Sequence, residues 1–218
     1  MGYSLLGVQP EQVFFFIHGP GSTGKSTLMK AIQQAVGSYH RAADFSTFLR
    51  QPGGNGGGGS ASPDLARLAR IRLVSSTEVG HGQALNDGLL KQLSGGDKVT
   101  ARALYAEDQE WIPIMGLWLV ANDRPKGRVD DDALWRRLRP FEFSEKVSGA
   151  AVDSTLGDRL AQDECQQAIL AWMILGARDY LATCHLEPPE RVRKGIEAYR
   201  ASSNPLTEFY EDSCIVAQ

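Results

Sequence analysis

The chain has 218 residues, of which 42% are hydrophobic and 22% are charged, and its formal net charge is −3 at pH 7. This length suffices for one buried core with a small second unit. The mildly acidic balance excludes a protein that binds nucleic acid through overall positive charge, so any such surface must be local. No apolar run approaches the roughly 20 residues that span a bilayer, and no secretory signal opens the sequence. We therefore expect a cytoplasmic protein without a membrane partner.

The three cysteines are Cys165, Cys184 and Cys214. They are too far apart for a zinc cluster, and their odd number does not suit a disulfide framework. We expect all three to be reduced thiols in the core.

The first motif is GPGSTGKS over 19–26, which satisfies the pattern G-x-x-x-x-G-K-[ST]. An apolar run over 13–17 predicts a buried strand before it, and an amphipathic pattern predicts a helix after it that runs to about Val36. Glycines let the backbone N–H groups point at an anion, and the helix N-terminus adds a partial positive charge. Lys25 would contact the β- and γ-phosphates, and the Ser26 hydroxyl would ligate Mg²⁺. The expected ATP-binding residues are Gly19, Pro20, Gly21, Ser22, Thr23, Gly24, Lys25, Ser26 and Thr27.

The next stretch leads to a second buried strand. A short strand is expected over 39–43, and the glycine-rich run over 53–59 predicts a loop without packed structure, either natural or engineered. A helix is expected to start at Ser62-Pro63, followed by a strand over 71–76 that ends at Thr77-Glu78. We expect this strand to lie beside the phosphate-loop strand, where the Glu78 carboxylate would hold Mg²⁺ and orient the attacking water. An ordinary surface glutamate is the alternative.

A helix over about 83–93 precedes an alternating segment over 98–105, which predicts an exposed β ribbon that turns near 106–109 and returns at 111–113. A third apolar strand, over 115–120, ends just before Asn122. Because this is the ligand-binding edge of a parallel sheet, Asn122 would position a water against the γ-phosphate. A turn-forming asparagine is the alternative.

Asp130, Asp131 and Asp132 are expected to cap a short helix that contains Arg136 and Arg137. Three interpretations of the two arginines stay open. Their side chains could be exposed to solvent, could pair with the three aspartates, or could contact the γ-phosphate of a neighbouring subunit. A strand follows over 140–143.

The rest of the chain is expected to be helical. One helix would run over about 158–184, a second over 190–200, and a last one would start near Thr207. The expected apolar face of the first is Ile169, Trp172, Met173 and Leu175, with the aromatic residues of the region in the core.

Five motifs occur in order: the phosphate loop, the strand ending in Thr77-Glu78, K-x-LSGGDK-x-x-x-R over 91–102, the strand ending in Asn122, and WRRL over 135–138. Together they resemble superfamily 3 helicases of the phage and plasmid primase–helicase type, related to poxvirus replicative ATPases. The resemblance covers nearly the whole chain. It implies an α/β fold, namely an AAA+-like P-loop NTPase sandwich of three layers with a central, mostly parallel sheet. The ATPase core would cover 1–148, and a small C-terminal helical segment would cover 149–218.

The same resemblance implies an ATP-dependent DNA helicase of phage or plasmid replication, in the host cytoplasm, that uses ATP and Mg²⁺ and moves along single-stranded DNA. It would assemble as a homo-hexamer and hydrolyse ATP between subunits. Family members have a helical collar before this region and a winged-helix-like segment after it, and we expect neither here, so a monomer is the alternative. The resemblance implies that Lys25 and Ser26 contact phosphate and metal, that Glu78 is the Walker B acid, and that Asn122 senses the γ-phosphate. It implies that Arg137 is the arginine finger, with Arg136 as the alternative, and that Lys91 is a sensor at the subunit interface. The implied DNA contacts are Lys98, Arg102 and Tyr105.

Two other functions fit less of the pattern. A P-loop kinase of a small metabolite would need an acceptor pocket and an arginine-rich lid, and the basic hairpin is a poor lid. A nucleotide-gated DNA-binding module would bind without unwinding.

Overall fold

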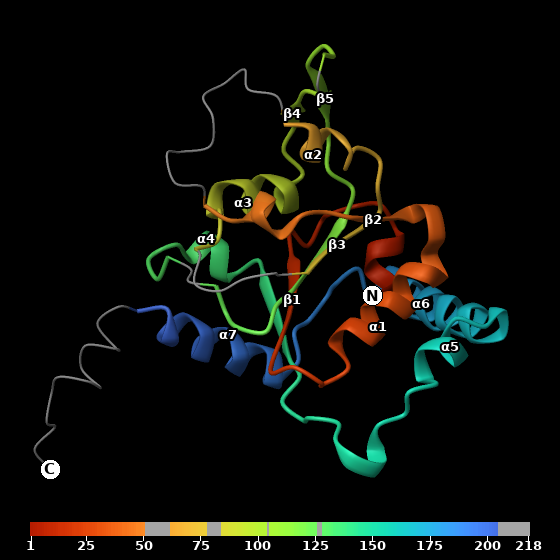
Figure 1. Ribbon diagram of the computed structural model, residues 1–218. Helices are drawn as coiled ribbons and strands as arrows, with labels where there is room; N and C mark the ends of the chain where they lie inside the picture. Colours follow the sequence, from red (N-terminus) through yellow and green to blue (C-terminus); the bar gives the residue numbers. More distant parts are fainter. Residues whose placement is uncertain (51–61, 78–83, 104, 126–127, 205–218) are drawn as a thin grey trace, which may run out of the picture.

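The computed structural model describes residues 1–50, 62–77, 84–103, 105–125 and 128–204. Five strands, all parallel, form one sheet in the order β2–β3–β6–β1–β7, with helices on both faces (Figure 1). The strands of the sheet are β1 (Phe14–His18), β2 (His40–Ala42), β3 (Leu73–Thr77), β6 (Gly116–Val120) and β7 (Leu138–Glu142). The α-helices are α1 (Lys25–Val36), α2 (Pro63–Ala66), α3 (Asp87–Gly95), α4 (Asp132–Trp135), α5 (Leu156–Leu160), α6 (Asp163–Thr183) and α7 (Glu190–Ser202). Short 3₁₀ turns are η1 (Gly2–Leu5), η2 (Gly37–Tyr39), η3 (Phe45–Phe48) and η4 (Gly149–Ala151).

The helices divide into two layers, each with its own apolar core. On one face of the sheet, Phe15 and Trp118 pack with Met29 of α1 and Met173 of α6. On the other face, a second cluster joins the sheet to α3, α4 and α7, as Tyr199 of α7 shows. The predicted α/β sandwich with a central parallel sheet is therefore confirmed.

The order of the strands corrects one expectation. We expected β3, which ends next to Glu78, to lie beside β1, but β6 separates the two. All five residues of β6 are buried, and Trp118 is in register with Phe15 on one side and with Ser75 on the other. A strand that is apolar on both faces is typical of the interior of a parallel sheet whose two faces are covered by helices.

The predicted ribbon is confirmed as an antiparallel pair of β4 (Val99–Ala101) and β5 (Gln109–Trp111).

Helix α4 is shorter than expected, because it ends at Trp135 and Leu138 already pairs with β1. Arg136 and Arg137 therefore lie in the connection between α4 and β7.

The single helix expected over 158–184 is two helices, α5 and α6, because Gln162 between them is extended and two acidic residues favour a new helix start. Helix α6 packs through Met173, Ala177 and Tyr180, and Gly2 approaches its backbone so closely that a Cβ there would lie 2.3 Å from the Met173 carbonyl oxygen.

The expected apolar face of α6 is partly wrong. Trp172 and Leu175 are 56% and 48% exposed. They lie outside the narrow stripe that packs against η1 and α1, whereas Met173 is buried and Ile169 packs at its edge.

The expectation of core thiols is also wrong where it can be compared, because Cys184 is exposed and Cys165 only half-buried. Cys214, the glycine-rich loop and the helix expected near Thr207 lie outside the described residues.

None of the helices within the described ranges is long and apolar enough to cross a membrane. The division at residue 148 stays a prediction, and α6 and α7 both share core clusters with the sheet.

Candidate nucleotide site

The loop after β1 has the backbone of an anion-binding cradle. Ser22 and Gly24 have positive φ angles of 63° and 85°, and turns of this kind direct successive N–H groups inward. Gly19 also has a positive φ, and a Cβ there would lie 2.1 Å from the Phe143 carbonyl oxygen. The sequence therefore requires glycine at this position for close approach as well as for conformation.

Lys25 begins α1 and is only 5% exposed. Its ammonium group donates to the carbonyl oxygens of Gly19 at 2.6 Å and Pro20 at 2.7 Å, and it lies 3.3 Å from the Thr23 hydroxyl. Burial lowers the pKa of Lys25 below its usual value. A cation held inside its own loop in this way is well placed to exchange backbone carbonyls for phosphate oxygens.

Asn122 follows β6 and lies at the same edge of the sheet as this loop. Its carbonyl oxygen accepts a hydrogen bond from the Gly19 N–H at 3.2 Å, and its side chain is exposed. Thr77, at the end of β3, is in register with Val120 of β6. Glu78 lies outside the described residues, but the strand that precedes it ends at this same edge.

A hollow of about 340 Å³ adjoins the start of α1. Ser26, Lys30 and Gln34 line one side of it, and Asp153 and Leu156 line the other. This volume falls within the range of small-molecule pockets. The chain that leads to its second side is attached to the loop at one point, where the Val147 N–H donates to the Ser22 carbonyl oxygen at 2.8 Å.

Sequence reasoning missed a buried titratable group behind the loop. His18, the last residue of β1, is buried, and the Arg124 guanidinium lies 3.6 Å from the Glu142 carboxylate nearby. Burial, together with the positive charges of Arg124 and Lys25, lowers the pKa of His18 to about 4. His18 is therefore neutral at pH 7. A histidine directly before the motif was the only signal in the sequence.

This pKa predicts that stability falls in mild acid. Below pH 6.5 the unfolded chain binds a proton at His18 that the folded chain takes up only near pH 4, so folding is penalised across that window. Between pH 7 and pH 5 the loss should be about 2 kcal/mol in the free energy of unfolding. Urea unfolding at both pH values measures it. His40, whose pKa burial also lowers, contributes in the same direction, so the comparison with His18→Gln isolates His18. An equal pH dependence in that variant would contradict the assignment.

The two arginines after α4 differ sharply in exposure. Arg137 is 8% exposed, and its guanidinium donates to the Ala133 carbonyl oxygen at 2.9 Å and to the Gln12 side chain at 3.2 Å. Burial and the adjacent charge of Arg136 lower the pKa of Arg137. Arg136 is exposed. Both precede β7, at the edge of the sheet opposite the phosphate loop, because the Phe14 N–H donates to the Arg137 carbonyl oxygen.

Lys91 of α3 is bound within the chain. Its ammonium group lies 2.6 Å from the Asp131 carboxylate, which also accepts from the Leu134 N–H and so caps α4. Burial alone would raise the pKa of Asp131, but these two hydrogen bonds bring it below its usual value. In this chain Lys91 therefore fixes the start of the segment that leads to the two arginines.

The β4–β5 hairpin projects from the body of the protein (Figure 1). Its expected DNA contacts are paired with acids of the return strand, Lys98 with Glu110 at 3.3 Å and Arg102 with Asp108 at 3.8 Å. Tyr105 is fully exposed near the tip. Ion pairs this exposed contribute little and exchange readily, so both cations remain accessible to a competing phosphate.

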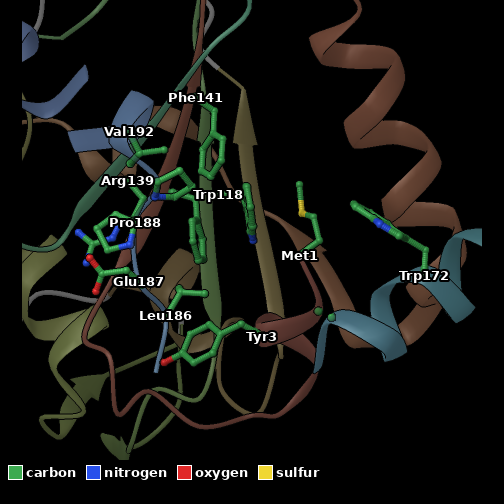
Figure 2. Close-up of a pocket in the computed structure, with 14 residues that line it drawn as sticks. Met1, Tyr3, Trp118, Arg139, Phe141, Trp172, Leu186, Glu187, Pro188 and Val192 are labelled. Carbon is green, nitrogen blue, oxygen red and sulfur yellow. The ribbon is translucent and has the colours of Figure 1, made fainter. Parts of the chain in front are cut away.

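A further hollow of about 260 Å³ lies on the α6 side of the sheet (Figure 2). Phe15 and Trp118, whose rings stack at 4.0 Å, form its floor with Phe141, and Trp172 lies at its α6 side. It shares no residue with the phosphate loop, so it is not part of the candidate nucleotide site.

Comparison with known proteins gives a consistent result. A segment of 142 residues, 65% of this chain, is 34% identical to "Putative helicase L207/L206" of Acanthamoeba polyphaga mimivirus. Over 96% of the chain, identity is 25% with "Putative helicase 022R" of Frog virus 3, and over 95% it is 23% with "Putative helicase 184R" of Invertebrate iridescent virus 6. The chain is a homologue of viral proteins named as helicases. It spans only 14%, 23% and 24% of the length of these three relatives. No family model matches it.

Solved structures show the same fold. The apo structure of the NrS-1 C-terminal region in its A form superposes on 96% of this chain with a TM-score of 0.64 and 10% identity. A second apo structure of that region covers 98% of this chain and 54% of the other, with a TM-score of 0.56. At this identity the likeness concerns the fold, which agrees with the P-loop NTPase architecture expected from the sequence.

Proposed function

We propose that the chain is the ATP-hydrolysing part of a superfamily 3 DNA helicase that acts in viral or plasmid-type DNA replication. The observation that supports this most directly is the meeting of the Lys25 loop and Asn122 at one edge of a parallel sheet. The viral relatives named as helicases support the same activity.

In this proposal the loop amides and Lys25 bind the β- and γ-phosphates of ATP. Ser26, exposed in the first turn of α1, and Glu78 supply oxygen ligands of the kind that Mg²⁺ prefers. Asn122 orients the attacking water, and the hollow beside α1 takes the rest of the nucleotide. Phosphoryl transfer needs mainly positioning and charge neutralisation, which these groups provide.

Within the described residues, the two arginines after α4 lie at the edge of the sheet opposite the phosphate loop, so in this proposal they do not reach the ATP of their own chain. We propose that a neighbouring copy supplies an arginine to the γ-phosphate in a head-to-tail homo-hexamer. Both arginines bond to Gln12, but Arg137 is buried whereas Arg136 is exposed, so the structure favours Arg136 as the finger. Lys91 would act by holding this segment in place.

The experiment that tests the function measures ATP hydrolysis with and without single-stranded DNA, and strand separation on a forked duplex. We expect DNA to stimulate hydrolysis and the fork to be unwound. Phosphate transfer to a small metabolite would instead identify a kinase.

The second candidate, a nucleotide-gated DNA-binding module, is favoured by one observation. The hairpin region from 98 to 111 contains two basic and three acidic side chains, and both cations are paired within it. ATP-dependent DNA binding without unwinding would support this candidate over a helicase.

The hairpin also makes a prediction about DNA affinity. Lys98→Ala should weaken binding to single-stranded DNA and lower the slope of log K against log salt by roughly 0.7, as expected for one lost phosphate contact. Glu110→Gln, which removes the competing carboxylate, should strengthen binding. Fluorescence anisotropy with a labelled oligothymidylate at several salt concentrations measures both. Lys194→Ala on α7 is the control, and an unchanged slope in Lys98→Ala would remove this lysine from the DNA path.

A further inference from the structure

Tyr199 of α7 is almost fully buried and touches the chain just after the sensor position. Its hydroxyl donates to the Pro125 carbonyl oxygen at 2.5 Å, three residues beyond Asn122. The Arg124 guanidinium lies over its ring, 5.6 Å from the centroid. Any movement of the β6 end that follows γ-phosphate binding would therefore change the contacts of this tyrosine.

The same ring also touches two other parts of the proposed machinery. It lies edge-on to Trp135, with the centroids 5.3 Å apart, and Trp135 directly precedes Arg136. It lies 6.4 Å from the ring of His18, which directly precedes the phosphate loop. One side chain thus contacts the segments that carry the loop, the sensor and the arginines.

The next residue of α7 strengthens the link to α4. The Arg200 side chain donates from Nε to the Val129 carbonyl oxygen at 2.9 Å and lies 2.6 Å from the Asp132 carboxylate, at the first residue of α4. Trp135 in turn donates from its indole N–H to the Arg128 carbonyl oxygen at 2.8 Å. Helix α7 therefore contacts the chain both at the β6 end and at the start of α4.

We propose that Tyr199 and Arg200 are positioning residues that couple nucleotide binding at Asn122 to the placement of the Arg136–Arg137 pair. The inference rests on the proposed function, because the arginines act on a neighbouring copy. A packed helix that contacts both functional segments is a physical connection through which such coupling can be transmitted. With ATP in its own loop, a subunit would then present its arginines correctly to the next subunit.

The test uses two mild variants of the full chain with ATP, Mg²⁺ and DNA. Tyr199→Phe removes one hydrogen bond and keeps the ring, and Arg200→Gln removes the ion pair with Asp132. We expect kcat and the Hill coefficient of hydrolysis to fall, kcat by about 10-fold, within the usual range of coupling between sites. The Kd of a non-hydrolysable ATP analogue should change less than about 2-fold, since neither residue lies in the loop. Lys194→Gln, whose ion pair with Glu190 stays within α7, is the matched control.

A double-mutant cycle separates coupling from a general loss of structure. If Arg200 acts through Asp132, Asp132→Asn should lower kcat similarly, and the double variant should be no worse than either single one. Unchanged kcat in both α7 variants, or a loss of analogue binding equal to the loss of kcat, would overturn the proposal. These outcomes leave the proposed function standing, whereas an unmodified chain that does not hydrolyse ATP overturns both.

Discussion

The Lys25→Ala chain is expected to bind Mg-ATP about 10- to 100-fold more weakly and to lose hydrolysis, while remaining folded. The loss corresponds to one charge-assisted contact with phosphate, typically about 1.5–3 kcal/mol. Among the described residues, the lysine bonds to atoms of its own loop, at Gly19, Pro20 and Thr23, so its removal should leave the sheet and both cores intact. Titration with a fluorescent ATP analogue measures the affinity.

Lys194→Ala, which removes an exposed lysine of α7, is the control for a general charge effect. Binding of the nucleotide by Lys25→Ala with unmodified affinity would contradict the phosphate site itself. The proposed helicase would then lack the ATP site that drives unwinding, and the names of the viral relatives would not rescue the proposal.

The second large effect concerns the adjacent arginines. Arg136→Ala should lower kcat by about 10³- to 10⁵-fold, as expected for loss of an arginine finger, with ATP affinity unchanged. Arg137→Ala should mainly reduce the free energy of unfolding, by about 1–3 kcal/mol, because it removes the buried bonds to Ala133 and Gln12. Steady-state hydrolysis and urea unfolding of the two variants separate the roles.

The sequence resemblance implied the opposite assignment, with Arg137 as the finger. A fully folded Arg137→Ala chain that has lost hydrolysis, beside an active Arg136→Ala chain, would restore that assignment. Mixing each arginine variant with Lys25→Ala chains adds a check. If the finger acts in trans, the Lys25→Ala chain still supplies its arginine to the intact phosphate loop of a neighbouring arginine variant, so hydrolysis should be partly restored.

The sequence was sufficient to predict the main elements of this fold, because their signals are local. The apolar run before Gly19 and the glycine after Val36 mark where β1 ends and α1 stops, and both boundaries agree with the structure to within a residue. The position of Asn122 beside the loop also followed from a general property of parallel sheets.

What the sequence did not show depends on contacts between distant segments. Strand order is one case, since nothing within β3 or β6 states which of them adjoins β1. The exposure of Trp172 is another, because helical spacing alone does not tell which stripe of an apolar helix packs against the rest of the protein. The burial of Arg137 depends on Gln12, 125 positions away along the chain. The pairing of Lys98 with Glu110 required the register of the hairpin.

The arginines precede β7 and the phosphate loop follows β1, at opposite edges of one sheet. Under the proposed trans arrangement, a row of copies has one terminal member whose ATP meets no arginine, whereas a closed circle has none. Turnover per chain should therefore rise with protein concentration as rows lengthen, and it should level off once they close. The dependence of turnover per chain on protein concentration therefore reports whether the rows close into rings, without an image of the assembly.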